Sequence, residues 1–325
     1  MIDRRRLLGA AAALPALAAT ARAQDRYPSR NITMIVPYPP GGQADFAARP
    51  IAKALEKILG RAVIVDNRGG AGGAIGNAAG ARATPDGYTL LMGLPVIAVL
   101  PEADRLFGRT PAYEMSQLQP VARILADPAL LAVPGSASWK TAQEFIDDAK
   151  NRPGQITYGS SGIYGTTHVA MEVLAQGAGI KLVHVPYRGV GPAVTGLLSG
   201  QIQAMASALG SVKAHADAGA MRILASWGEE RIASFPDTPT FKELGLPDVV
   251  YYNWAGLFVP KGVSEPVLTR LRETMRQAMQ DPEVVNVFVN GGSAPAYQDV
   301  PEFAPFVEKD SARLIRAVQA IGKVE

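Results

Sequence analysis

The sequence predicts two α/β domains, each with a mainly parallel β-sheet flanked by helices. Short apolar runs alternate with amphipathic helical patterns along the chain, and two series of this kind follow one another. Strands that alternate with helices form parallel sheets covered by helices, because each connecting helix packs back onto the sheet. The length of 325 residues and a hydrophobic content of 48% suit two domains of common size.

The first series begins at a short apolar run that ends at Pro37 and predicts a buried strand. A helix follows, with Ile51, Leu55 and Leu59 on one face. The expected elements are, in order, a strand at 32–36, a helix at 44–59, a strand at 62–65, a small-residue helix at 74–82 and a strand at 88–92.

The second series opens with a helical pattern that is closed by the breaker at 151–154. Its expected elements are a helix at 141–150, strands at 156–158, 182–184, 202–206 and 222–225, and helices at 166–176 and 193–198. The chain then returns through a strand at 255–259 and helices at 267–280 and 282–289. A last helix is predicted from one apolar face, made of Phe303, Val307, Leu314, Val318 and Ile321.

Residues 1–23 are expected to be an export signal and not part of the fold. Arginines at 4–6 precede an apolar stretch at 7–19 that is too short to span a bilayer, and small residues at 21–23 suit cleavage. The arginines favour the twin-arginine route, with an ordinary Sec signal as the alternative. The sequence therefore predicts a periplasmic protein.

Charge and cysteine content exclude several classes of function. The chain has 32 Lys+Arg and 29 Asp+Glu, and the signal holds four Arg and one Asp, so the remainder balances at 28 against 28. This gives no support for a nucleic-acid partner. There are no cysteines and only three histidines, so we expect no disulfide, no lipid anchor, no metal site and no cofactor.

The loop after the first strand is a candidate anion site. In parallel α/β sheets, ligands bind beyond the carboxyl ends of the strands. Glycines before a helix let the backbone approach a ligand, and the free N–H groups of the helix start attract anions. The alternative is a plain turn in which an aspartate caps the helix. The candidate residues here are Tyr38, Gly41, Gly42, Gln43, Ala44 and Asp45.

The loop after the first strand of the second series follows the same logic. Its hydroxyl groups suit a carboxylate or bridging waters, and helix capping is their alternative role. The candidate residues are Ser160, Gly162, Tyr164, Gly165, Thr166, Thr167 and His168.

Two other motifs favour neither a nucleotide site nor a catalytic site. The cluster at 69–73 lacks a dinucleotide fingerprint, because Ile75 stands where its third glycine belongs, and we interpret it as a close-packing turn. A serine-type hydrolase is the less favoured alternative function, since 159–163 lacks the final glycine of a nucleophile elbow. His168 is as well suited to packing as to catalysis. We therefore predict no catalytic residues.

An ordered set of motifs resembles the periplasmic receptors of tripartite tricarboxylate transporters, the Bug receptors. The motifs run through nearly the whole chain after the signal: 37–49, 65–73, Pro85-Asp86-Gly87-Tyr88-Thr89-Leu90-Leu91, 158–162, His168, 184–193, 239–247, Trp254 and 260–262.

The resemblance implies a type II-like periplasmic binding protein, a Venus-flytrap clamshell with its ligand cleft between two domains. It places one domain at 25–125 plus 250–325 and the other at 126–249. It implies a monomeric, non-catalytic receptor that captures a di-, tri- or aromatic carboxylate through the two loops and passes it to the membrane components of the transporter. A ligand-binding component of a sensory system remains the alternative.

Departures from the family pattern suggest which carboxylate is bound. Ser207 stands where an aspartate is common, which removes a partner for a ligand amine. We therefore expect a carboxylate without an amino group, in a cleft lined by Tyr38, Tyr164, Leu94 and Trp254. The alternative is that Tyr38 and Trp254 only pack the hinge.

Overall fold

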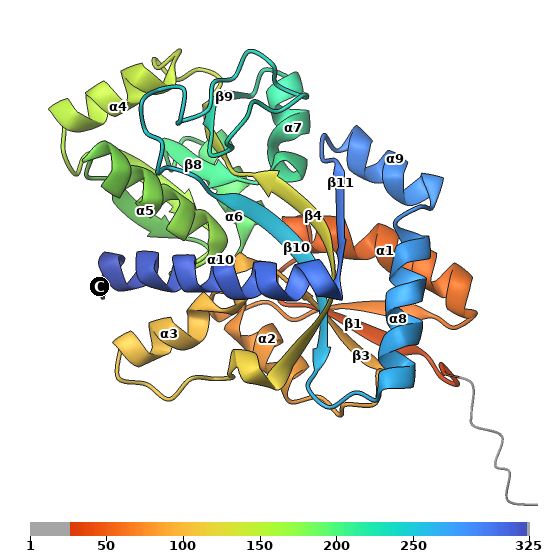
Figure 1. The fold of residues 1–325 in the computed structure, drawn as a ribbon. Coiled ribbons are helices and arrows are strands. Elements are labelled where there is room, and N and C mark those ends of the chain that lie inside the picture. The colour runs from red at the N-terminus through yellow and green to blue at the C-terminus, as the bar shows by residue number, and fades with distance from the viewer. Residues whose placement is uncertain (1–26, 324–325) are drawn as a thin grey trace, which may run out of the picture.

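The structure, a computed structural model, describes residues 27–323 and contains one sheet of six strands and one of five (Figure 1). The prediction of two α/β domains is confirmed. The predicted export signal at 1–23 lies outside the described residues. Within the described range, no helix is both long enough and apolar enough for a membrane crossing.

The first sheet is assembled from both ends of the chain. Its strands are β1 (Ile32–Val36), β2 (Val63–Asn67), β3 (Thr89–Gly93), β4 (Leu118–Pro128), β10 (Tyr252–Pro260) and β11 (Pro295–Asp299). They lie in the order β11-β4-β10-β3-β1-β2. The helices of this half are α1 (Gln43–Leu59), α2 (Ala74–Ala81), α3 (Val99–Leu106), α8 (Glu265–Ala278), α9 (Pro282–Asn290) and α10 (Val300–Ile321). Short 3-10 turns lie at η2 (Ala71–Gly73), η3 (Pro95–Ile97) and η4 (Met115–Gln117).

The second sheet uses one continuous stretch of chain. Its strands are β5 (Leu130–Pro134), β6 (Thr157–Ser160), β7 (Val183–Pro186), β8 (Ala204–Ser207) and β9 (Met221–Ser226), in the order β7-β6-β8-β5-β9. Its helices are α4 (Ala142–Asn151), α5 (Thr166–Ala178), α6 (Val190–Leu198) and α7 (Leu209–Asp217).

Both sheets are mixed, so the predicted parallel pairing holds for only part of each. β1 runs parallel to β2 and β3, and β6 runs parallel to β7 and β8. β10 is antiparallel to β3 and β4, and β5 is antiparallel to β8 and β9. The physical reason is the crossing between the sheets: β4 carries the chain out, β10 brings it back beside β4, and two such neighbours must be antiparallel. The predicted domain boundaries near 125 and 250 stay a prediction.

Several elements are absent from the sequence-based prediction, β4 above all. Two prolines, Pro120 and Pro128, lie within β4, and proline in a run normally argues against a strand because it cannot donate to the ladder. α3, α7, β5 and β11 were also not predicted. The absence of β4 from the prediction matters, because β4 and the predicted strand β10 together join the two halves of the molecule.

α10 lies across the middle of the molecule, between the two sheets (Figure 1). Four of its five predicted core residues are buried, and Ile321 is half-buried. They belong to a hydrophobic cluster that combines side chains from both halves, among them Ala103 of α3 and Val169 of α5. α10 therefore packs on both halves, and its apolar face fixes it there.

Candidate functional site

A cavity of about 1200 Å³, here called the cleft, lies between loops from both sheets. Residues 38–40 and 69–75 follow β1 and β2, and residues 161–164 and 186–189 follow β6 and β7. α3 and the segment after it close one side, through Leu100, Ala103, Asp104, Phe107 and Arg109. The four loops leave the carboxyl ends of parallel strands, which is where α/β sheets bind ligands.

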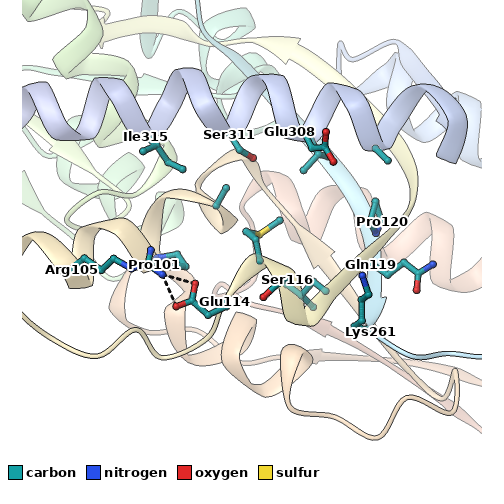
Figure 2. A pocket seen from close by; sticks show the side chains of 15 residues that line it. Pro101, Arg105, Glu114, Ser116, Gln119, Pro120, Lys261, Glu308, Ser311 and Ile315 are labelled. Atoms are coloured by element: carbon teal, nitrogen blue, oxygen red, sulfur yellow. Dashed lines mark hydrogen bonds and ion pairs between the residues drawn. The ribbon is translucent and has the colours of Figure 1, made fainter.

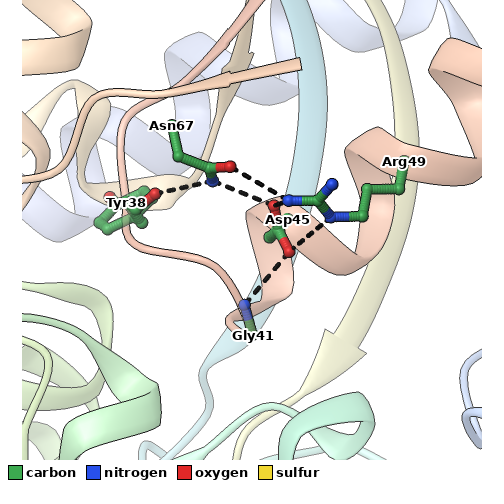
Figure 3. Close-up of polar contacts among 5 residues, drawn as sticks. All are labelled: Tyr38, Gly41, Asp45, Arg49 and Asn67. Carbon is green, nitrogen blue, oxygen red and sulfur yellow. Dashed lines mark hydrogen bonds and ion pairs between the residues drawn. The ribbon is translucent and has the colours of Figure 1, made fainter.

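Asp45 anchors the loop after β1 through a polar network (Figure 3). Its carboxylate accepts hydrogen bonds from the N–H of Gly41 (3.2 Å), the guanidinium of Arg49 (2.8 and 2.9 Å) and the amide of Asn67 (3.0 Å). The Asn67 amide also donates to the carbonyl of Tyr38 (3.0 Å). Burial alone would raise the pKa of Asp45, but these hydrogen bonds outweigh it and lower the pKa. The network thus holds Tyr38 against the start of α1.

The other predicted residues of this loop lie at the start of α1, beside the cleft lining. Gly41 is exposed with a left-handed φ of 90°, and Gly42 is the N-cap residue in extended conformation. A Cβ on Gly42 would lie 3.9 Å from the Cβ of Val190 in the second half. Ala44 is buried, and the Gln43 amide donates to a backbone carbonyl of β10 (2.6 Å). The first turn of α1 keeps N–H groups without intrahelical partners.

The loop after β6 is tied to the first turn of α5. Gly165 is the N-cap residue, and Thr166 and Thr167 are buried behind it. The Thr167 hydroxyl accepts from the N–H of Ser161 (2.7 Å) and donates to the Ser161 hydroxyl (3.2 Å). Gly162 lines the cleft with a φ of 128°, a conformation that favours glycine. The predicted hydroxyl groups therefore shape the loop, and Gly162 brings its backbone to the cleft.

Tyr164 connects the cleft to three helices. Its φ of 54° is left-handed, and its N–H donates to Nδ1 of His168 on α5 (2.8 Å). Its hydroxyl donates to the carbonyl of Gly322, directly after α10 (2.6 Å). Its ring packs edge-on against Phe107, which follows α3, at a centroid distance of 6.1 Å. The predicted position of Tyr164 in the cleft therefore agrees with the lining of the cavity.

Two histidines stack behind this loop. The ring centroids of His168 and His184 are 4.0 Å apart with planes 9° from parallel, and Tyr158 stacks on His184 at 5.0 Å. Burial lowers the pKa of His184 to about 4. Burial, and next the neighbouring His184, lower the pKa of His168 to about 3. Both rings are therefore neutral at neutral pH, which suits the acceptor role of His168 Nδ1.

Ser160 does not have the surroundings of a catalytic serine. Its hydroxyl lies 2.6 Å from Nε2 of His184 and also hydrogen-bonds to the backbone of Gly162. Ser160 has no exposed surface, so a substrate has no access to it. Among the described residues, no carboxylate hydrogen-bonds to His184 to orient it as a base. The pair supports the loop that lines the cleft.

The glycine cluster at 69–73 has a second role that sequence reasoning missed. It is a close-packing turn, as interpreted: a Cβ on Gly69 would meet Pro39 at 2.8 Å, and one on Gly73 would meet the ring of Tyr38 at 2.9 Å. The same turn lines the cleft, and a Cβ on Gly72 would lie 3.1 Å from the carbonyl of Ile163 in the opposite half. The sequence feature that could have revealed this second role is the position of the cluster directly after β2. Because β2 pairs in parallel with β1, the loops after both strands lie at the same edge of the sheet.

Of the predicted site residues, Tyr38, Gly162 and Tyr164 line the cleft. The other predicted residues of the two loops lie beside or behind this lining, and Leu94, Ser207 and Trp254 are buried elsewhere. Leu94 is buried in the core cluster that covers one face of the first sheet. Ser207 is fully buried, and its hydroxyl has no hydrogen-bond partner among residues 27–323. Trp254 is 1% exposed and donates from Nε1 to Asp310 of α10 (2.8 Å), next to Phe303. Trp254 therefore fastens α10 to β10, as the packing alternative proposed.

A second cavity of about 570 Å³ lies between α10 and the segment from α3 to β4 (Figure 2). Its lining mixes apolar residues with polar and charged ones, among which the Arg105 guanidinium binds the Glu114 carboxylate (2.7 Å). None of the residues that line this cavity also lines the cleft. In the part of the chain that the structure describes, no three His, Cys, Asp or Glu side chains are grouped to hold a metal.

Two α/β halves that enclose a cleft between their strand-to-helix loops define the class of the protein, a binding protein of the periplasmic type. The model of the tripartite tricarboxylate transporter family receptors, TctC, matches residues 47–323. The chain belongs to this family, and the resemblance inferred from its motifs is confirmed. The family consists of binding proteins for transport, not enzymes.

Similar proteins are found among both sequences and solved structures. Protein BugT of Bordetella pertussis (strain Tohama I) is 33% identical over 298 residues, which cover 92% of this chain and 91% of BugT. A structure of an R. palustris protein with adipate is 28% identical, with a TM-score of 0.84 over 90% of this chain and 97% of that one. MatC from Rhodopseudomonas palustris with bound malate is 26% identical, with a TM-score of 0.81 over 90% and 99%.

Proposed function

We propose that this receptor binds a small carboxylate without an amino group in the periplasm and delivers it to the membrane components of a tripartite tricarboxylate transporter. The export signal at 1–23 accounts for the location. The ligands named for the two R. palustris relatives, adipate and malate, are both carboxylates of this kind. The receptor is proposed to act as a monomer.

The hydroxyl of Tyr38 is the observation that carries the proposal. Tyr38 lines the cleft and is 6% exposed, yet its hydroxyl has no hydrogen-bond partner among the described residues. A buried hydroxyl without a partner costs about 1–3 kcal/mol. A ligand oxygen that reaches this hydroxyl when the two halves move, and accepts from it, recovers this energy. The starts of α1 and α5 add backbone N–H groups and the positive ends of two helix dipoles.

We place the ligand carboxylate between the loops Tyr38–Asp45 and Ser160–His168, which belong to different halves. The halves correspond to 25–125 plus 250–325 and to 126–249, and they close on the ligand about β4 and β10. Closure of this kind is a hinge motion that a membrane partner can recognise. Gly42 and Val190 face one another across the two halves, which supports the importance of close approach there.

A thermal-shift and calorimetric panel of mono-, di-, tri- and aromatic carboxylates tests the ligand class, with aspartate and glutamate for comparison. A true ligand at one hundred times its dissociation constant stabilises the protein by about 2.7 kcal/mol. We expect this from amine-free carboxylates. Tight binding of aspartate or glutamate, without binding of any amine-free acid, would contradict the proposal.

Two variants test the placement of the carboxylate. Tyr38→Phe should weaken binding by about tenfold, because it removes one donor to the ligand. Gly42→Phe should weaken it by about a hundredfold or more, since the ring would project toward Val190 and hold the halves apart. Gly42→Ala is the matched control, because its Cβ would make only ordinary contact at 3.9 Å. Unchanged affinity in both Tyr38→Phe and Gly42→Phe would place the carboxylate elsewhere.

A further inference from the structure

We propose that Arg109 and Arg188 form a subsite for a second carboxylate, so that the receptor selects a dicarboxylate whose far end touches both halves of the protein. The inference rests on the proposed function, in which the first carboxylate lies at the starts of α1 and α5. It goes further by assigning the selectivity of the cleft to two side chains.

The charged side chains that line the cleft are Arg109, Arg188 and Asp104. Their formal sum is one positive charge. A ligand in the cleft therefore meets two cations and one anion beyond the backbone N–H groups. Both arginines are exposed, and this balance of charge favours a ligand that carries more than one negative charge.

Asp104 is engaged by the chain that follows α3. Its carboxylate accepts from the N–H of Ala112 (3.3 Å), and its carbonyl accepts from the N–H groups of Phe107 and Arg109 (3.1 and 2.8 Å). Asp104 forms no ion pair with either arginine of the cleft. It therefore shapes the turn that presents Arg109 and leaves the guanidinium groups available.

Arg109 is positioned without being neutralised. Its guanidinium lies over the ring of Phe107, 4.7 Å from the centroid, and Phe107 in turn packs on Tyr164 of the opposite half. A cation over an aromatic face is held in place while its N–H groups stay free to donate. Among the described residues, Arg109 has no carboxylate partner.

Arg188 lies on the other side of the cleft, in the loop after β7. It is exposed and has no ion-pair partner among residues 27–323. Gly189, next to it, has a φ of 125° and lies against Pro39, so that a Cβ there would be 3.0 Å from the proline ring. This contact seats the loop, and with it Arg188, at the boundary between the two halves.

Arg105, in the same region, is an arginine whose guanidinium is already paired with a carboxylate. It lies on α3, one turn before Arg109, but points to the second cavity and binds Glu114 (Figure 2). Arginine recognises carboxylates through paired N–H groups, and unpaired arginines in a cleft are available for such recognition. Arg109 and Arg188, unlike Arg105, have guanidinium groups that are available to bind a ligand carboxylate.

The test compares diacids with their monomethyl esters, which have nearly the same shape but one charge less. Glutarate, adipate, pimelate, malate and phthalate, each with its monomethyl ester, are screened by thermal shift at pH 8, and the tightest pair is measured by calorimetry. We expect the diacid to bind at least about tenfold more tightly than its ester. Arg109→Gln and Arg188→Gln should each remove most of that difference and leave binding of the ester unchanged.

Arg105→Gln is the matched control, because it removes a charge from α3 outside the cleft and should preserve the preference for the diacid. Equal binding of diacid and ester, or equal weakening of both by the cleft variants, would overturn the two-arginine subsite while the carboxylate receptor stands. If only one of the two variants reduces the preference for the diacid, the far carboxylate does not contact both halves. Failure of every acid and ester to bind would overturn the proposed function itself.

Discussion

The protein should lose stability between pH 8 and pH 5, and replacing His168 by asparagine should make this loss smaller. Burial, and next His184, lower the pKa of His168 from 6.5 to about 3. In this pH range the unfolded chain takes up a proton and the native ring stays neutral. The free energy of unfolding therefore falls as the pH drops below about 6.5, until the pH reaches the native pKa near 3.

The magnitude follows from the same linkage. At pH 5 the unfolded histidine is almost fully protonated, and the native His168 is not, which costs about 2 kcal/mol relative to pH 8. His168 is 1% exposed, so solvent does not reduce this effect. His184 acts in the same direction, but it is only half-buried and contributes less. Asparagine at 168 keeps an oxygen that can accept from the N–H of Tyr164, and it does not titrate.

Urea unfolding followed by far-UV circular dichroism at pH 8, 7, 6 and 5 measures the effect. The difference in unfolding free energy between pH 8 and pH 5 should be smaller by about 2 kcal/mol in His168→Asn than in the native protein. His215→Asn, which removes the histidine outside the stack, is the control. Identical pH profiles for the native protein and His168→Asn would refute the reasoning.

Two further predictions concern buried carboxylates. Asp45→Asn should lower the free energy of unfolding by about 1–3 kcal/mol at pH 7, because hydrogen bonds from Gly41, Arg49 and Asn67 lose their charged acceptor. Since the native pKa of Asp45 is lowered, the deficit should shrink below about pH 4, and a deficit independent of pH would contradict this. Burial, only partly offset by the Ser293 hydroxyl, raises the pKa of Asp127 to about 6, so its ionisation removes about 1.4 kcal/mol of stability between pH 5 and pH 8. Asp127→Asn should abolish that contribution in the same urea titration, and an unchanged profile would show that Asp127 is already ionised at pH 5.

The sequence placed most of the elements that position the cleft. Apolar runs and breakers placed β1, α1, β6 and α5 within two residues of their observed ends. These signals are local, because the spacing of apolar residues directly reflects the burial of a strand or of one helix face. The two loops that carry glycines before a helix start were found for the same reason.

Local sequence patterns could not predict the direction of the strands or the connection between the two halves. β4 contains two prolines and pairs with β10, more than a hundred residues away along the chain. The pattern of apolar residues within 118–128 does not indicate that this segment pairs with β10. The antiparallel pairing therefore became visible only in the sheet itself.

By itself, the sequence determined the α/β class, the family and the two loops at the cleft, because each depends on residues that are neighbours in the chain. Only the tertiary structure decided which side chains line the cleft. It turned Trp254 toward Asp310 and away from the cleft, and it brought Arg109 and Arg188 to the same cavity from different halves. The physical reason is that a cavity is defined by what covers it, and here the covering residues come from segments that only the packing of two sheets and α10 brings together.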